Sequence, residues 1–300
     1  SGTYISDNNI TDKVNRKNIA VITTYVDAYI FPQMIQHVER VLSNAGYTVQ
    51  ISFTYNRISR EKSILEGIVA KDDIAGVIAE PTKSSLPNPN LKYYEKLRKK
   101  HVPVLFMNTY YEALDAPHVS MDDIMAGKIA TQYVIGKGHK RIGGVFKLDD
   151  SQGSRRYFGF LEAMNEASLR VTGNDLLWFD TVDIENEENV RQLAERIRKR
   201  LSTRTALVLY NDESAYKLIN EFNKMGLKIP DDISIVGIDD TVLSTNGTVQ
   251  ITSVAYPTEE IAVKAANNLL ELIKNGRFDA TYEFSVHIVE RDSVKDLTDN

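Results

Sequence analysis

Polar side chains at the ends of short apolar segments carry the clearest chemistry in this chain. They are Glu80, Asn108, the pair Asp122 and Asp123, Asn211, Asp239, and Arg156 in the segment after Lys147. Carboxylate, amide and guanidinium groups are planar and can each make two hydrogen bonds in a fixed geometry, which suits the neighbouring hydroxyls of a sugar. The apolar faces on which a sugar ring stacks could come from four aromatic residues, Tyr29, Phe31, Trp178 and Phe179.

Each of these residues also has a purely structural interpretation. An Asp or Asn that follows a strand is often the N-cap of the next helix, where its side-chain oxygen accepts a backbone N–H. Aromatic residues near strand ends often belong to the core. The joint occurrence of so many polar groups at segment ends favours a binding site over a set of unrelated caps.

Catalysis and metal binding have weaker support in the sequence. The chain has no cysteine, and its five histidines show no metal-ligand spacing. It has no Gly-x-Ser-x-Gly elbow, and the segment 136–140 lacks the spacing of a phosphate-binding loop. Asp239 and Asp240 are adjacent on an extended segment, so their side chains point in opposite directions and do not share one reacting centre. We therefore expect no enzyme activity, no metal and no cofactor.

The elements that must position these residues alternate between apolar strands and amphipathic helices. Strands are predicted at 18–23, 49–53, 74–79, 102–107, 142–147, 176–179, 205–210, 233–238 and 283–289. Helices are predicted from about 31 to Gly46, and at 59–71, 91–100, 123–135, 155–167, 187–201, 213–225 and 258–275, with an exposed loop at 81–89. This α/β alternation predicts two doubly wound lobes with parallel sheets covered on both faces. Ligands bind beyond the carboxyl ends of such strands, so the polar side chains should face one another across a cleft.

Composition excludes some classes of protein. The 300 residues, 42% hydrophobic and 26% charged, fit a soluble protein of two lobes. The net charge of −5 argues against direct contact with nucleic acid, which requires clustered Lys and Arg. No apolar run approaches the roughly 18 residues of a membrane span. The absence of cysteine fits a reducing cytoplasm, and we expect no membrane partner.

Several segments together resemble the effector domain of the lactose/galactose-repressor family. They are Val102-Pro-Val-Leu-Phe106, Ser120-Met-Asp-Asp-Ile-Met-Ala-Gly127, Gly138-His-Lys-Arg-Ile142, Ser154-Arg-Arg-Tyr-Phe-Gly-Phe160, and Ile229-Pro-Asp-Asp-Ile-Ser-Ile-Val-Gly-Ile-Asp-Asp240. The resemblance covers about residues 18–291. It implies a periplasmic-binding-protein-like fold with three chain crossings. Lobe one would hold 18–138 plus 254–279 and lobe two 139–253 plus 280–291, with a linker at 1–17 and a loose tail at 292–300.

The resemblance also implies roles for individual residues. Arg156 matches the arginine that grips the effector, so its replacement by alanine should abolish binding and leave the fold intact. Asn211, Asp239 and Asn108 match other ligand positions, whereas the register leaves both Asp122 and Asp123 as candidates. Tyr29 and Phe31 lie in a segment that departs from the family pattern, because it reads Ala-Tyr-Ile-Phe where the family usually reads Asn-Pro-Phe-Phe.

The amino terminus resembles part of a different regulator family. Ser1-Gly-Thr-Tyr-Ile-Ser6 is similar to the end of the wing in winged-helix regulators of the gluconate-repressor type. It implies a missing DNA-binding domain through which the whole protein contacts operator DNA; the alternative is a cloning scar followed by a tail. The implied function is a homodimeric sugar sensor of a repressor, with a monosaccharide, L-arabinose first, as effector. Alternatives are a secreted sugar-binding protein of a transporter and, more distantly, a sugar hydrolase or isomerase.

Overall fold

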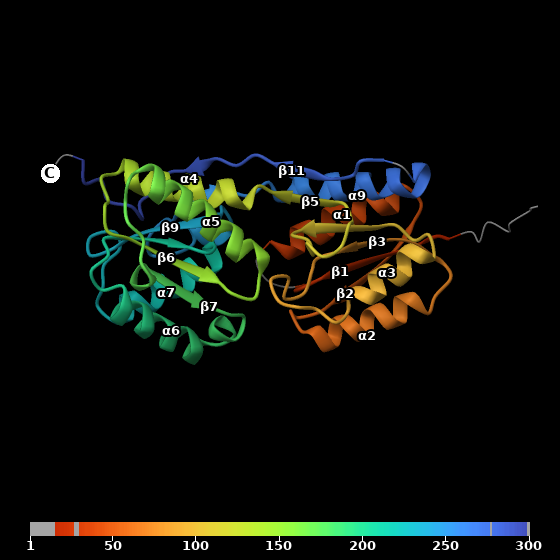
Figure 1. The fold of residues 1–300 in the computed structure, drawn as a ribbon, viewed down its shortest axis with the longest axis horizontal. Coiled ribbons are helices and arrows are strands. Elements are labelled where there is room, and N and C mark those ends of the chain that lie inside the picture. The colour runs from red at the N-terminus through yellow and green to blue at the C-terminus, as the bar shows by residue number, and fades with distance from the viewer. Residues whose placement is uncertain (1–15, 27–29, 277, 299–300) are drawn as a thin grey trace, which may run out of the picture.

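Two six-stranded sheets, each covered by helices, form two lobes that lie side by side (Figure 1). The computed structural model describes residues 16–26, 30–276 and 278–298. Most of the predicted linker 1–17 therefore lies outside the described residues. The predicted fold class, two doubly wound α/β lobes, is confirmed.

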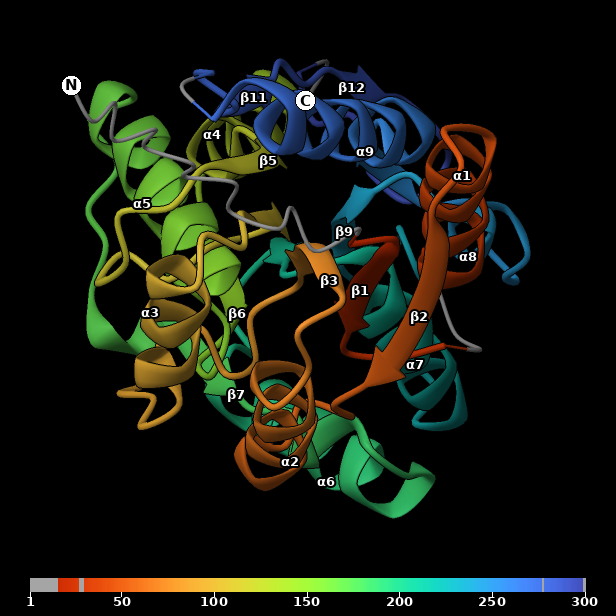
Figure 2. The same ribbon diagram turned by 90° about the vertical axis from the view of Figure 1, so that its right-hand side faces the viewer.

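Lobe one is built on the sheet of order β11-β5-β4-β3-β1-β2, in which all neighbouring strands are parallel. Its strands are β1 (Asn18–Thr23), β2 (Thr48–Phe53), β3 (Ile74–Ala79), β4 (Val104–Asn108), β5 (His118–Met121) and β11 (Tyr282–Phe284). Its helices are α1 (Phe31–Asn44), α2 (Ile58–Val69), α3 (Leu91–Lys99) and α9 (Thr258–Asn275). The central strand β3 is buried at every residue, because α1 and α9 cover one face of the sheet and α2 and α3 the other (Figure 2).

Lobe two is built on the sheet of order β12-β10-β9-β8-β6-β7, parallel except where β12 pairs with β10. Its strands are β6 (Ile142–Lys147), β7 (Leu176–Phe179), β8 (Ala206–Leu209), β9 (Ser234–Asp239), β10 (Thr252–Ala255) and β12 (Ile288–Val289). Its helices are α4 (Asp123–Gly136), α5 (Ser151–Glu166), α6 (Glu187–Arg200), α7 (Asp212–Lys224) and the short α8 (Val242–Thr245), with 3-10 turns η1 (Gly173–Asp175) and η2 (Val182–Ile184).

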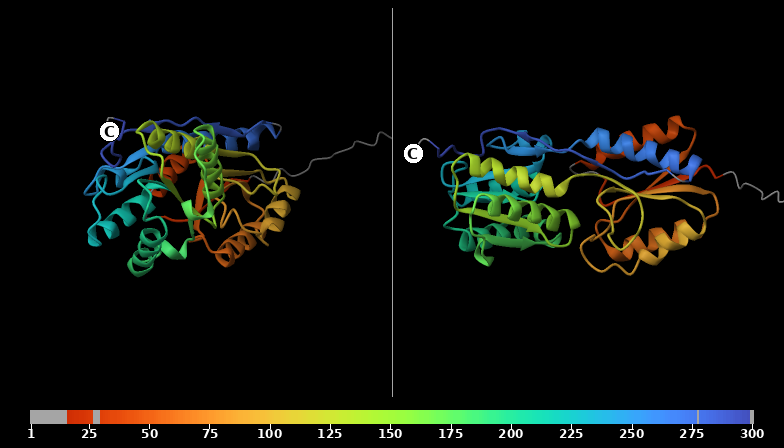
Figure 3. Two further views of the ribbon diagram at one scale, coloured as in Figure 1. Left: turned by 60° about the vertical axis from the view of Figure 1, so that its left-hand side comes forward. Right: turned by 45° about the horizontal axis from the view of Figure 1, so that its top comes forward.

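The chain crosses between the lobes three times, from β5 to α4, from β10 to α9 and from β11 to β12. The crossing segments lie along one side of the molecule (Figure 3). Within the described residues, no helix is both long and apolar enough to span a bilayer.

Several details differ from the sequence prediction, which also lacked the short strands β5 and β10. Helix α4 was expected in lobe one but packs against α5 and the second sheet. The expected single strand 283–289 is two short strands, of which β11 joins the first sheet and β12 the second. Helix α5 starts at Ser151, four residues before the predicted start. Part of the predicted loose tail packs on lobe two, where the buried Ser293 hydroxyl donates to the carbonyl of Ile235.

Candidate ligand-binding site

A cavity between the lobes brings together five of the residues predicted from the sequence. This inner cavity, of about 50 Å³, is lined by Phe31, Glu80, Asn108, Asn211 and Asp239 among others. Asn108 ends β4, Asp239 ends β9, and Glu80 and Asn211 follow β3 and the β8 segment. The carboxyl ends of strands from both sheets thus meet at one place. Ligands of parallel sheets bind beyond these strand ends.

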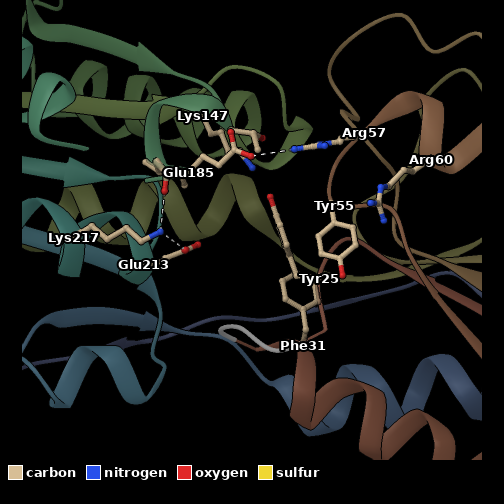
Figure 4. Close-up of a pocket in the computed structure, with 11 residues that line it drawn as sticks. Tyr25, Phe31, Tyr55, Arg57, Arg60, Lys147, Glu185, Glu213 and Lys217 are labelled. Carbon is tan, nitrogen blue, oxygen red and sulfur yellow. Dashed lines mark hydrogen bonds and ion pairs between the residues drawn. The ribbon is translucent and has the colours of Figure 1, made fainter. Parts of the chain in front are cut away.

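A larger outer cavity, of about 300 Å³, adjoins the inner one (Figure 4). The two share Tyr25, Phe31, Lys147, Ile184 and Glu213. The outer cavity is further lined by Tyr55, Arg57, Arg60, Thr181, Glu185 and Lys217. Both lobes contribute to each cavity, so any ligand held there contacts both lobes.

A hydrogen-bonded chain forms the lobe-one side of the inner cavity. The Glu80 carboxylate accepts bonds from the backbone N–H of Thr24 at 2.7 Å and from its hydroxyl at 2.6 Å. The amide of Asn108 donates to Glu80 at 3.0 Å and accepts from the hydroxyl of Tyr256. Burial raises the pKa of Glu80 to about 7 although these hydrogen bonds from Thr24 and Asn108 oppose the rise. Asn108 has a φ of +72°, a left-handed conformation that Asn adopts more readily than most residues.

Arg156 lies behind the site rather than in it. Its side chain is 1% exposed and lines neither cavity. The guanidinium donates to Asp123 at 2.9 Å, to Asp239 at 3.0 Å and to the carbonyl of Tyr210 at 2.7 Å. It therefore ties the start of α4 to the ends of β8 and β9. The resemblance implied that Arg156 grips the effector; in this structure it bonds instead to Asp239 and Tyr210, which both line the inner cavity.

The two acids at the start of α4 have different environments. Asp122 is the N-cap of α4, where its carboxylate accepts the backbone N–H of Met125 at 2.9 Å. Asp123 is buried beside Arg156, and burial raises its pKa to about 7 although the Arg156 charge opposes the rise. Neither acid lines the two cavities.

The remaining aromatic candidates lie elsewhere. Trp178 is on the edge strand β7, packs against Phe146 and Tyr157, and lines a separate hollow with residues of α6. Phe179 is buried in the core of lobe two. Tyr29 lies outside the described residues.

Several lining residues were not predicted. Lys147 ends β6 and pairs with Asp150 at 3.2 Å. Burial opposes its charge, but Asp150 and Asp149 outweigh burial and raise the pKa of the ammonium above its ordinary value. Its position at a strand end is the same signal that identified Glu80 and Asn108. Tyr25 and Tyr256 also line the inner cavity, and Tyr256 was missed because the short strand β10 before it was not predicted.

Glu80 makes protein stability depend on pH in a defined direction. Its pKa of about 7 in the folded protein exceeds the ordinary 4.5. Its contribution to stability is therefore fully present below pH ~4.5 and is lost as the pH rises through ~7. The difference in unfolding free energy between Glu80→Gln and the natural protein should therefore shift by about 2 kcal/mol in favour of the variant when the pH rises from ~5 to ~8. Urea titrations at both pH values measure this, with the exposed Glu95→Gln as control; an equal effect of Glu80→Gln at both would contradict it.

Comparison with known proteins identifies the family. A model of the periplasmic binding protein-like domain matches residues 131–294. The arabinose metabolism transcriptional repressor of Halalkalibacterium halodurans is 36% identical over 293 residues, covering 96% of this chain and 78% of the relative. The repressor of the same name from Geobacillus stearothermophilus is 36% identical over 301 residues, covering 99% and 82%. The transcriptional repressor PurR of Salmonella paratyphi B is 28% identical over 288 residues, covering 95% and 82%.

Solved structures of regulators share the fold. The transcription regulator CcpA of Lactococcus lactis superposes with a TM-score of 0.82 at 22% identity, covering 93% of this chain and 99% of that one. The regulator CelR in complex with cellobiose has a TM-score of 0.78 at 20% identity, covering 93% and 86%. The family match over residues 131–294 and the 36% identity over nearly the whole chain show that this chain belongs to the periplasmic binding protein-like family, as a sensor domain of the LacI class of transcription repressors.

Proposed function

We propose that this sensor domain binds a monosaccharide, L-arabinose first, between its lobes and thereby lowers the affinity of the full repressor for operator DNA. The observation that carries the proposal is the inner cavity, where acidic and amide groups from both sheets converge beside aromatic rings. The identity to two arabinose metabolism repressors supports arabinose among the sugars. It also favours a cytoplasmic regulator over a secreted binding protein of a transporter.

The lining matches an uncharged polyol. Glu80, Asp239 and the amides of Asn108 and Asn211 offer acceptors and donors, and Lys147 adds a cationic donor. The rings of Tyr25 and Phe31, whose centroids are 5.7 Å apart, offer an apolar surface where the two cavities adjoin. A few polar groups placed among apolar ones is the usual composition of a small-molecule site.

Contacts across the cleft provide a route from binding to a change of state. The loop after β3 reaches lobe two through Lys83, whose ammonium pairs with Asp149 at 2.6 Å. Asn56 donates to Thr181 across the cleft at 2.7 Å. A ligand that contacts both lobes adds to these bonds and shifts the population toward the closed arrangement. We propose that a homodimer transmits this shift to a DNA-binding domain outside this sensor.

Thermal-shift and calorimetric titrations with L-arabinose, xylose, ribose, galactose and phosphorylated pentoses test the ligand. We expect L-arabinose to raise the melting temperature most, with a dissociation constant of about micromolar order. A rise in melting temperature with only a phosphosugar or a non-sugar would refute the assignment.

Asn211 offers a variant that separates binding from folding. Its side-chain oxygen caps α7 by accepting the backbone N–H of Ser214 at 3.0 Å, which leaves the amide nitrogen for a ligand. Serine preserves the cap but removes the amide. We expect Asn211→Ser to weaken arabinose binding about tenfold with unchanged unfolding free energy. Calorimetry and urea titration measure the two quantities, and unchanged affinity would exclude Asn211 from the site.

A further inference from the structure

A row of aromatic rings leads from the inner cavity to the mouth of the outer one. The ring of Phe31 lies 5.7 Å from that of Tyr25, which lies 6.4 Å from that of Tyr55 in an edge-to-face arrangement. The guanidinium carbon of Arg60 then lies over one face of the Tyr55 ring, 4.6 Å from its centroid. In Figure 4 these side chains border the open space of the cavity. The row continues past the inner cavity, since Tyr55 and Arg60 line only the outer one.

The backbone holds Tyr55 in place at the mouth. Tyr55 and Asn56 both adopt left-handed conformations, with φ of +51° and +52°. This conformation is uncommon for a bulky aromatic residue and occurs often at functional sites. The turn is held by the Tyr55 N–H donating to the Thr24 carbonyl at 2.8 Å and by Asn56, which accepts the Lys83 N–H at 2.8 Å. The Tyr55 side chain nevertheless remains 39% exposed, so the turn presents the ring rather than burying it.

The charges of the outer cavity balance one another. Arg57 pairs with Glu185 at 3.2 Å, and Lys217 pairs with Glu213 at 2.7 Å. Lys147 pairs with Asp150, which lines the inner cavity. Three of the four cations are thus already paired with carboxylates, and Arg60 stacks on Tyr55. Paired planar groups beside exposed aromatic rings suit the hydroxyls and faces of a neutral sugar ring better than a phosphate.

We propose that the outer cavity is a second sugar subsite and that the protein binds a pentose disaccharide more tightly than a free pentose. One ring occupies the inner cavity, and the second stacks on Tyr55 and bonds to Arg57 and Glu185. The inference rests on the proposed function, because the first ring uses the monosaccharide site. The second subsite adds a preference for a disaccharide over a monosaccharide, and this preference depends on residues of the outer cavity.

Isothermal titration calorimetry with L-arabinose, arabinobiose, xylobiose and arabinose 5-phosphate tests this inference. We expect a disaccharide to bind about tenfold more tightly than L-arabinose. Tyr55→Ala should remove that advantage and leave the affinity for L-arabinose unchanged. The matched control is Tyr282→Ala. It removes an exposed tyrosine on β11 that lines neither cavity, and it should change neither affinity. Melting temperatures establish that each variant is folded.

The outcomes separate the two proposals. Equal affinity for the pentose and both disaccharides, or an equal loss for both kinds of sugar in Tyr55→Ala, refutes the second subsite and leaves the monosaccharide site standing. A gain in affinity confined to arabinose 5-phosphate also refutes it, because the mouth then binds an anion. Failure of every sugar to bind refutes the proposed function and the second subsite together.

Discussion

Replacement of Arg156 by alanine should lower the free energy of unfolding by about 3–5 kcal/mol, because the change removes one member of a buried ionic network. Arg156 bonds to Asp123 and Asp239, and all three side chains are buried. Without the guanidinium, both carboxylates stay in a region of low dielectric where their charge is costly. The family resemblance implied that this substitution would leave the fold intact, and the burial of Arg156 leads to the opposite expectation.

Urea titration of Arg156→Ala measures the loss, with Arg155→Ala as the neighbouring control. Arg155 is partly exposed, and its ion pairs with Glu112 and Glu283 have lengths of 3.5 and 3.6 Å. Its guanidinium also lies over the Tyr110 ring at 4.3 Å, so its loss should cost about 1–2 kcal/mol, less than the loss of Arg156. A double-mutant cycle of Arg156→Ala with Asp123→Ala should give a coupling of about 1–3 kcal/mol. Equal stabilities of the two arginine variants would contradict the structural role of Arg156.

The second large effect is expected at the contact between α4 and α5. A Cβ at Gly159 would overlap the carbonyl oxygen of Ile124, and one at Gly127 would overlap the carbonyl oxygen of Arg156. The two glycines therefore allow the helix backbones to touch, and this contact brings Arg156 to Asp123. Gly159→Ala should separate the helices and lower the unfolding free energy by about 3 kcal/mol.

Gly67→Ala is the matched control for this prediction. Gly67 lies in α2, and a Cβ there meets no atom within 4 Å. Alanine favours the helix at such a position, so Gly67→Ala should raise the unfolding free energy by about 0.5–1 kcal/mol. Thermal and urea unfolding of both variants measure the effects. Stabilisation by Gly159→Ala of the same size as by Gly67→Ala would refute close contact between α4 and α5.

Local sequence patterns determined the fold class and the inner cavity. Alternating apolar strands and amphipathic helices predicted two parallel sheets, because each strand buried on both faces needs helices on both sides. Polar residues at strand ends predicted that Glu80, Asn108, Asn211 and Asp239 would meet, and they line one cavity. These four residues meet because the carboxyl ends of parallel strands share one edge of each sheet and the two lobes face each other at those edges.

Other features were decided by contacts between residues far apart in the chain. The sequence around α4 predicts a helix without a distinct apolar face, and only its contact with α5 assigns it to lobe two. Strands β5 and β10 contain polar residues and lack the unbroken apolar run that predicted the equally short β7. The burial of Arg156 depends on acids 33 and 83 positions away. The placing of Tyr55 beside Tyr25 likewise depends on a turn held by Thr24 and Lys83. A local pattern specifies which face of an element is apolar, whereas partners distant in sequence decide which charged side chain is buried and which ring faces the ligand.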